Sequence, residues 1–203
     1  MFYYNGPDES ASAKKTRQPG QFAGRATPPF RPTVMSDTTD QHRQAAPQAV
    51  RCAVVTVSDT RTLATDRGGE LIVTLLESAG HPSVRREIVP DDPQRIGALI
   101  AELANASDVD AVLVTGGTGI APRDQTFETI GCMLTKPLPG YGELFRMLSY
   151  GDIGPAAMLS RAIGGVIGRV VVLTMPGSPA AVQLAMEKLI VPELGHLVYE
   201  ARK

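Results

Sequence analysis

From about residue 50 onward, two kinds of hydrophobic pattern alternate along the chain. Short continuous apolar runs indicate strands covered on both faces, and segments with apolar residues at every third or fourth position indicate helices. The first kind predicts strands over residues 51–57, 84–89, 111–114 and 169–174. The second kind predicts helices over residues 66–79, 93–106, 125–134, 142–148, 155–160, 178–191 and 193–200. Gly80 is expected to end the first helix, and Pro192 to separate the last two.

This order of elements predicts an α/β fold. Strands that alternate with helices form an open, mostly parallel sheet with right-handed crossover connections. Ligands of such sheets bind at the carboxyl ends of the strands, near the point where the strand order reverses. The segments rich in polar residues, glycine and proline fall at these ends, at residues 58–61, 90–92, 115–119 and 175–179. We therefore expect one site where these four loops meet.

The loop after the third predicted strand is the most informative of the four. Gly116, Gly117 and Gly119 follow the apolar run, and Arg123 and Asp124 come just before a helical pattern. Because glycines carry no side chain, backbone N–H groups there can approach a phosphate, and the start of a helix adds partial positive charge. Asp124 alone would repel a phosphate, so a divalent cation between the two would explain the carboxylate.

Two interpretations of this loop stay open. Its glycines match neither the P-loop nor the G-x-G-x-x-G fingerprint, and a tight connection between a strand and a helix would use the same residues. The Arg-Asp pair favours the phosphate and metal site. Two further residues also have alternative roles. Asp59 either contacts a ligand or caps a helix, and Arg161 either meets a phosphate or pairs across a subunit contact.

The first 48 residues differ in composition from the rest. They hold six of the 16 prolines, and Val34 is their only Val, Ile or Leu. Such a segment buries too little apolar surface to offset the entropy of ordering it. We therefore expect a disordered N-terminal tail over residues 1–48 and one folded domain over residues 49–203. A start of translation at Met35 is an alternative.

Charge and cysteine content exclude several classes of protein. The formal net charge is -1 and the aromatic fraction 5%, without a basic cluster interleaved with aromatics, so we expect no nucleic-acid surface. No apolar run is long enough to span a membrane, and the first residues lack the pattern of a secretory signal. Cys52 and Cys132 lie outside metal-type spacings and are expected to be buried, reduced thiols. A cytoplasmic location is therefore the expectation.

Seven short motifs, taken together, resemble those of the molybdopterin adenylyltransferase family, the MogA/MoaB type of molybdenum cofactor biosynthesis protein. They are Val57-Ser58-Asp59, Pro90-Asp91-Asp92, Thr115-Gly116-Gly117-Thr118-Gly119, Arg123-Asp124-Gln125-Thr126, Pro139-Gly140-Tyr141-Gly142-Glu143, Leu159-Ser160-Arg161-Ala162 and Pro176-Gly177-Ser178-Pro179. The resemblance runs from about Arg51 to about Leu197, and residues 145–149 are similar to the MoaB branch in particular.

The resemblance implies a three-layer α/β/α sandwich around a mostly parallel sheet. It implies an enzyme that uses ATP and Mg²⁺ to adenylylate molybdopterin, with release of pyrophosphate. Members of the family assemble as trimers or hexamers, so a homotrimer or homohexamer is expected, and a contact with a molybdenum-insertion enzyme is left open. The alternatives are a non-catalytic molybdopterin-binding or carrier protein of the same pathway, and a scaffold subunit of a larger assembly.

The family's functional residues map onto this sequence one by one. Its two essential carboxylates fall on Asp91 and Asp124, which the resemblance implies as catalytic residues and Mg²⁺ ligands. The attacking phosphate is already ionised and needs no general base, so the histidines are assigned no chemistry. The residues implied in contacts to molybdopterin or nucleotide are Thr56, Ser58, Gly116, Gly117, Thr118, Gly119, Ser160, Pro176, Gly177 and Ser178.

The segment from Pro137 to Ala162 carries many apolar residues between repeated glycines and prolines. So many apolar side chains in a broken segment are hard to bury within one sheet sandwich, and an exposed patch of that size usually marks an interface. We expect this segment at or beside a subunit contact. A lid over the pterin site is the alternative.

Overall fold

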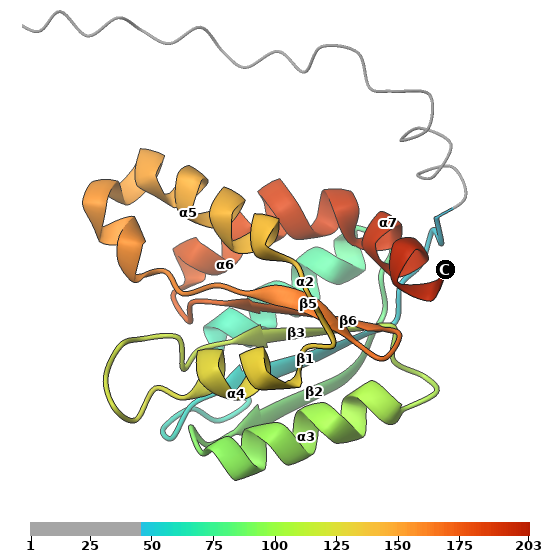
Figure 1. Ribbon diagram of the computed structural model, residues 1–203, viewed down its shortest axis with the longest axis horizontal. Coiled ribbons are helices and arrows are strands. Elements are labelled where there is room, and N and C mark those ends of the chain that lie inside the picture. Colours follow the sequence, from blue (N-terminus) through green and yellow to red (C-terminus); the bar gives the residue numbers. More distant parts are fainter. Residues whose placement is uncertain (1–45) are drawn as a thin grey trace, which may run out of the picture. The chain divides into compact units, whose positions relative to one another are not determined.

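A six-stranded sheet lies between two layers of helices in the computed structural model of the chain, which describes residues 46–203 (Figure 1). The strands are β1 (Cys52–Val57), β2 (Ser83–Val89), β3 (Ala111–Thr115), β4 (Lys136–Pro137), β5 (Gly164–Ile167) and β6 (Val170–Met175), in the spatial order β2-β1-β3-β6-β5-β4. Four of them, β2, β1, β3 and β6, pair in parallel. The predicted three-layer α/β/α sandwich is confirmed. Residues 1–45 of the predicted tail lie outside the part of the chain that the structure describes.

Two hydrophobic cores cover the two faces of the sheet. Neighbouring residues of a strand point to opposite faces, so Val54 belongs to one core and Val55 to the other. The first core packs under α2 (Arg67–Ser78), α5 (Pro139–Ile153), α6 (Pro179–Ala185) and α7 (Val191–Arg202). The second packs under α3 (Pro93–Asn105) and α4 (Thr126–Met133), which lie on the opposite side of the sheet in Figure 1. Coverage of both faces explains why β1, β3 and β6 are continuous apolar runs.

The ends of α2 follow from its sequence. At the start, the Asp66 side chain accepts a hydrogen bond of 3.0 Å from the backbone N–H of Gly69. At the end, Gly80 adopts a φ of 80° and donates to the carbonyl of Glu77, while His81 donates to that of Leu76. This pair of bonds is a Schellman motif, which glycine favours because it enters the left-handed region without steric cost. The predicted end of the helix at Gly80 is confirmed.

The sequence pattern did not predict β4 and β5. β4 has two residues, and β5 begins with Gly164 and Gly165, so neither forms a recognisable apolar run. Both are antiparallel to their neighbours and extend the sheet beyond β6. A proline in β4 is tolerated because that strand lies at the edge of the sheet. The segment after β4 also differs from the prediction, since α5 is one helix over Pro139–Ile153 followed by a 3₁₀ turn over Gly154–Leu159.

The last helices are continuous through Pro192. A π-helical segment over Met186–Ile190 joins α6 to α7, so the predicted separation at Pro192 is wrong. Proline has no backbone N–H, and its ring collides with the carbonyl four residues earlier in a regular α-helix. A local π-helical turn relieves that collision without ending the helix.

The two cysteines differ in their surroundings. Cys52 is buried as predicted, and burial raises the pKa of its thiol to about 12. Cys132 is exposed, so the prediction that it is buried is wrong. Thr126 and Ile130, four residues apart, form the buried stripe of α4, which leaves Cys132 on the outer side of that helix.

Candidate active site

The loops that follow β1, β2, β3 and β6 converge at one edge of the sheet. The backbone N–H of Asp91, after β2, donates to the carboxylate of Asp59, after β1, at 3.2 Å. The N–H of Gln125, after β3, donates to Asp91 Oδ1 at 3.1 Å. Gly116, also after β3, donates to the carbonyl of Met175 at the end of β6, at 3.1 Å. The convergence predicted from the parallel sheet is therefore present.

The backbone conformation of the loop after β3 requires glycine at two positions. Gly116 and Gly117 have φ values of +98° and +62°, in the left-handed region that side chains disfavour. A Cβ on Gly116 would lie 2.3 Å from the carbonyl oxygen of Val57 at the end of β1. A Cβ on Gly117 would lie 2.0 Å from Thr126 Oγ1 and 2.8 Å from Asp91 Oδ2. The glycines thus let this loop press against both the first strand and Asp91.

Asp91 and Asp124 both border that loop, because a Cβ on Gly117 would lie 2.8 Å from Asp91 Oδ2 and one on Gly119 would lie 2.4 Å from Asp124 Oδ2. Burial raises the pKa of Asp91, the Gln125 N–H opposes this shift, and the charges of Asp124 and Asp59 raise it further. Asp124 Oδ2 accepts a hydrogen bond of 3.1 Å from the N–H of Ala121, at the far end of the loop. The charges of Asp124 and Asp59 both raise the pKa of Asp91, so the three carboxylates share one electrostatic environment. A cation bound there would relieve their repulsion.

The donor set fits Mg²⁺ in its chemistry. Mg²⁺ usually takes one or two carboxylates and keeps waters and substrate phosphates as its other ligands. Asp91 and Asp124 provide two carboxylates of this kind, and the Thr126 hydroxyl is fully buried beside Asp91 without a hydrogen-bond partner. Within residues 46–203 no group of three or more His, Cys, Asp or Glu side chains forms a complete protein cage for a metal ion. A cation at this edge would therefore rely on substrate oxygens.

Two of the predicted contact residues make structural hydrogen bonds. The hydroxyl of Thr56 is buried and donates to Asp66 Oδ2 at 2.8 Å. Ser58 Oγ accepts from the backbone N–H groups of Thr60 and Arg61, at 3.3 Å and 3.2 Å. Ser58 keeps its own hydroxyl proton for a further acceptor, whereas the proton of Thr56 is already donated.

The predicted contact residues outside the glycine-rich loop and β1 gather between β6 and the end of α5. Ser160, Pro176 and Ser178 line one cavity of about 150 Å³, together with Ser149 and Asp152. Ser178 also caps α6, because its Oγ accepts from the N–H of Ala181 at 3.3 Å. Gly177 lies against the glycine-rich loop, where a Cβ on it would be 3.4 Å from the α-carbon of Gly116. Gly177, which stands between the lining residues Pro176 and Ser178, thus places this cavity next to Gly116 of the glycine-rich loop.

Arg161 has a role that the sequence left undecided. Its Nε donates to the carbonyl of Thr118 at 3.0 Å, and its Nη2 donates to the carbonyl of Gly119. The same guanidinium forms an ion pair with Glu128 of α4 and lies 5.0 Å from the centre of the Phe127 ring. The hydrogen bond that Arg161 donates to Glu128 lowers the pKa of the Glu128 carboxyl. Arg161 therefore holds the glycine-rich loop within the protomer.

The sequence did not predict a hydrogen-bond network that centres on the buried carboxylate of Asp66. Asp66 accepts from Thr56, from the N–H of Gly69 and, at 3.2 Å, from Arg86. Arg61 lies 3.7 Å from the same carboxylate and donates to the carbonyl of Gly177 at 3.2 Å. Asp66 thus links the start of α2 to the loop after β6. The sequence signal was limited to the position of Asp66 at the start of a helix, which predicts a cap but not the two arginines.

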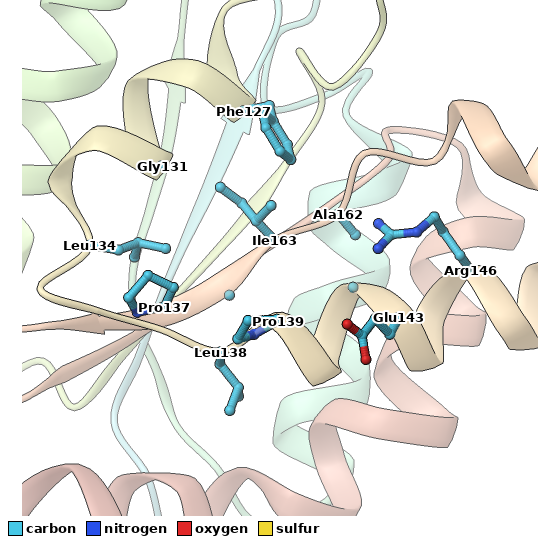
Figure 2. Close-up of a pocket in the computed structure, with 12 residues that line it drawn as sticks. Phe127, Gly131, Leu134, Pro137, Leu138, Pro139, Glu143, Arg146, Ala162 and Ile163 are labelled. Carbon is cyan, nitrogen blue, oxygen red and sulfur yellow. The ribbon is translucent and has the colours of Figure 1, made fainter.

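A separate apolar pocket of about 270 Å³ lies between α4, β4 and α5 (Figure 2). In Figure 2, Phe127, Leu134, Pro137 and Ile163 surround it, while Glu143 and Arg146 project from α5. None of the predicted site residues lines this pocket. The residues predicted to carry the chemistry therefore lie at the strand-end edge and outside this apolar pocket.

The fold and this edge define the class of protein, an α/β domain with a glycine-rich loop and paired carboxylates at the carboxyl ends of its strands. The family model described as "Probable molybdopterin binding domain" matches residues 53–196. Molybdenum cofactor biosynthesis protein B of Bacillus cereus is 54% identical over 164 residues, which cover 80% of this chain and 97% of that protein. The protein of the same name from Bacillus subtilis is 52% identical over 167 residues, covering 82% and 98%.

Solved structures agree with these relatives. A crystal structure of a molybdenum cofactor biosynthesis protein B is 55% identical, with a TM-score of 0.75, and covers 77% of this chain and 98% of that chain. The tungsten cofactor synthesizing protein MoaB from Pyrococcus furiosus is 38% identical, with a TM-score of 0.69, covering 78% and 100%. The chain belongs to the MoaB family of molybdenum cofactor biosynthesis proteins. Among the helices of residues 46–203, none is both long and apolar enough to cross a membrane.

Proposed function

We propose that this protein is a molybdopterin adenylyltransferase. A phosphate oxygen of molybdopterin attacks the α-phosphorus of ATP and forms a new P–O bond. The bond from that phosphorus to the oxygen bridging the α- and β-phosphates breaks, and pyrophosphate leaves with the bridging oxygen. The attacking phosphate is ionised at neutral pH, so the step transfers no proton and needs no general base. Adenylyl-molybdopterin and pyrophosphate are the products.

The observation that carries this proposal is that Asp91 and Asp124 both border the glycine-rich loop, Asp91 beside Gly117 and Asp124 beside Gly119. Burial raises the pKa of Asp91, and the Asp124 charge adds to that effect, which is the environment expected of carboxylates that share a cation. Bound Mg²⁺ would reduce the repulsion between the two phosphates that must meet. The positive φ values of Gly116 and Gly117 support a backbone turn of the kind whose N–H groups bind anions.

The two substrates need adjoining sites at this edge. We assign the triphosphate to the glycine-rich loop, since glycines let backbone N–H groups approach a phosphate at the start of a helix. The neighbouring cavity of Ser160 and Ser178 offers hydroxyl groups, which donate to phosphate or to pterin nitrogen and oxygen atoms without adding charge. Arg161 fixes the loop between the two sites through the carbonyls of Thr118 and Gly119. Orientation of two bound anions is then the main contribution of the protein.

The proposal is tested by measuring pyrophosphate release. Purified protein is incubated with Mg-ATP, with and without molybdopterin. We expect pyrophosphate only when molybdopterin is present, in an amount that matches the molybdopterin added and not the protein. Binding of molybdopterin without pyrophosphate release would identify a carrier of the same pathway instead.

A further inference from the structure

The start of α4 lies against both oxygens of Asp91. The backbone N–H of Gln125 donates to Asp91 Oδ1 at 3.1 Å. The next residue, Thr126, is fully buried, and its Oγ1 has no hydrogen-bond partner. A Cβ on Gly117 would lie 2.0 Å from Thr126 Oγ1 and 2.8 Å from Asp91 Oδ2. The hydroxyl and the second carboxylate oxygen therefore border the same small space beside the α-carbon of Gly117.

A buried hydroxyl without a partner is uncommon and calls for an explanation. Within residues 46–203, Thr126 Oγ1 and Arg86 Nε are the buried side-chain polar atoms of this kind. Folded proteins pair nearly all such atoms, because an unpaired buried donor is costly. Asp91 Oδ2 borders the same space as the hydroxyl and is a charged acceptor, which forms the stronger kind of hydrogen bond. A turn of either side chain brings the two together.

We propose that Thr126 is a positioning residue for Asp91, whose hydroxyl donates to Oδ2 while the Gln125 N–H holds Oδ1 when a divalent cation binds. The inference rests on the proposed function, since it concerns the same carboxylate and the same cation. Each carboxylate oxygen has two lone pairs, so one on each remains for the cation after the two hydrogen bonds form. Outer hydrogen bonds of this kind fix the direction in which a ligand faces its metal ion.

The test uses Mn²⁺ as the probe, with free Mn²⁺ followed by electron paramagnetic resonance in titrations of the full chain at neutral pH, with and without ATP. Thr126→Val keeps the shape of the side chain and removes the hydroxyl, Thr126→Ser keeps the hydroxyl, and Thr129→Val makes the same change one turn along α4. We expect Thr126→Val to weaken Mn²⁺ binding about tenfold. Thr126→Ser restores binding, and Thr129→Val matches the wild type.

Wild-type Mn²⁺ affinity in folded Thr126→Val would overturn the inference. If that variant fails to fold, NMR of the wild type decides, because a slowly exchanging Thr126 hydroxyl proton should appear on addition of Mg²⁺, and its absence contradicts the inference. These readouts need no molybdopterin. A wild type that binds Mn²⁺ without adenylylating molybdopterin overturns the proposed function alone, and one that never binds Mn²⁺ overturns both proposals.

Discussion

Arg161 and Glu128 form an ion pair that ties the segment before β5 to the first turns of α4. From this anchored position Arg161 donates to the carbonyls of Thr118 and Gly119, so the pair fixes one side of the glycine-rich loop. The two residues are 33 positions apart in the sequence. The loop is thus held by contacts from outside its own strand–helix unit.

Arg161→Lys should weaken ATP binding about tenfold, because a lysine cannot replace the fork of guanidinium donors and one charged hydrogen bond is worth roughly 1.5 to 3 kcal/mol. Calorimetric titration with Mg-ATP measures the effect. Arg169→Lys is the matched control, since Arg169 is exposed and donates to the carbonyl of Arg202, away from the loop. Equal ATP affinity in Arg161→Lys and the wild type would show that the loop does not depend on this clamp.

Gly117→Ala should abolish Mn²⁺ and ATP binding. The new Cβ would lie 2.0 Å from Thr126 Oγ1 and would also suffer the strain of a positive φ. Gly80→Ala separates the two effects, because Gly80 has a similar φ of 80° but no atom within 4 Å of its Cβ position. We expect Gly80→Ala to cost roughly 1 to 2 kcal/mol of stability with normal ligand binding. Normal binding by Gly117→Ala would contradict the account of the loop.

The strand-end loops could be predicted from the sequence, because a parallel sheet places the carboxyl ends of its strands at one edge whatever the side chains are. Asp91 and Gln125 meet there although they lie 34 positions apart. The partners of individual hydroxyls could not be predicted. Thr56 lies within β1 and Ser58 follows it, and the hydroxyl of Thr56 is donated to Asp66 in the core. Which partner a hydroxyl finds depends on tertiary packing that no local pattern records.

The two outer strands beyond β6 could not be predicted from the sequence either. β5 begins with two glycines, and a Cβ on Gly165 would lie 2.5 Å from the carbonyl oxygen of Lys136 in β4. These glycines permit close approach of two short strands, but a local pattern of glycines predicts a turn equally well. The antiparallel pairing became evident only with the tertiary structure.

Asp110 should stabilise the fold in a pH-dependent way. Burial opposes its ionisation, but hydrogen bonds from Arg51 and Arg202 outweigh that effect and lower the pKa to about 2. The folded pKa is below the usual value of 3.8, so the stabilisation is present above about pH 4 and is lost as the pH falls towards 2. Asp110→Asn should lower the free energy of unfolding by about 1 to 3 kcal/mol at pH 7 and flatten its dependence on pH below 4.

Urea unfolding at pH 7 and pH 3 measures both effects. Asp108→Asn is the control, because Asp108 is half-exposed and lies 3.4 Å from Arg85, and such surface pairs contribute about 0 to 1 kcal/mol. The account of Asp110 fails if the two variants lose the same stability and keep the same pH dependence.

The protein should form a closed oligomer through the segment from Pro137 to Ala162. Seven of its large apolar side chains are exposed in the protomer: Leu138, Leu144, Met147, Tyr150, Ile153, Met158 and Leu159. An apolar patch of this kind usually marks an interface. Light scattering at micromolar concentration should give at least three times the protomer mass of 21.6 kDa.

Met158→Glu should shift that oligomer towards the monomer, because Met158 is 75% exposed within the patch. Leu63→Glu is the control, since Leu63 is 59% exposed but lies outside this segment. A monomeric mass for the wild type would contradict the predicted interface and favour the alternative, a lid over the proposed pterin site.

The most direct test of the central claim follows the α-phosphate of ATP. Purified protein is incubated with molybdopterin, Mg²⁺ and ATP labelled at the α-phosphate, and the products are separated by chromatography. We predict that the label moves to molybdopterin with one pyrophosphate released for each label transferred. Asp124→Asn should reduce the rate on the order of 10²–10³-fold while its melting temperature stays near that of the wild type. Label that remains in ATP when the wild type holds both substrates, or an Asp124→Asn variant with wild-type turnover, would contradict the assignment of this edge as an adenylyltransferase site.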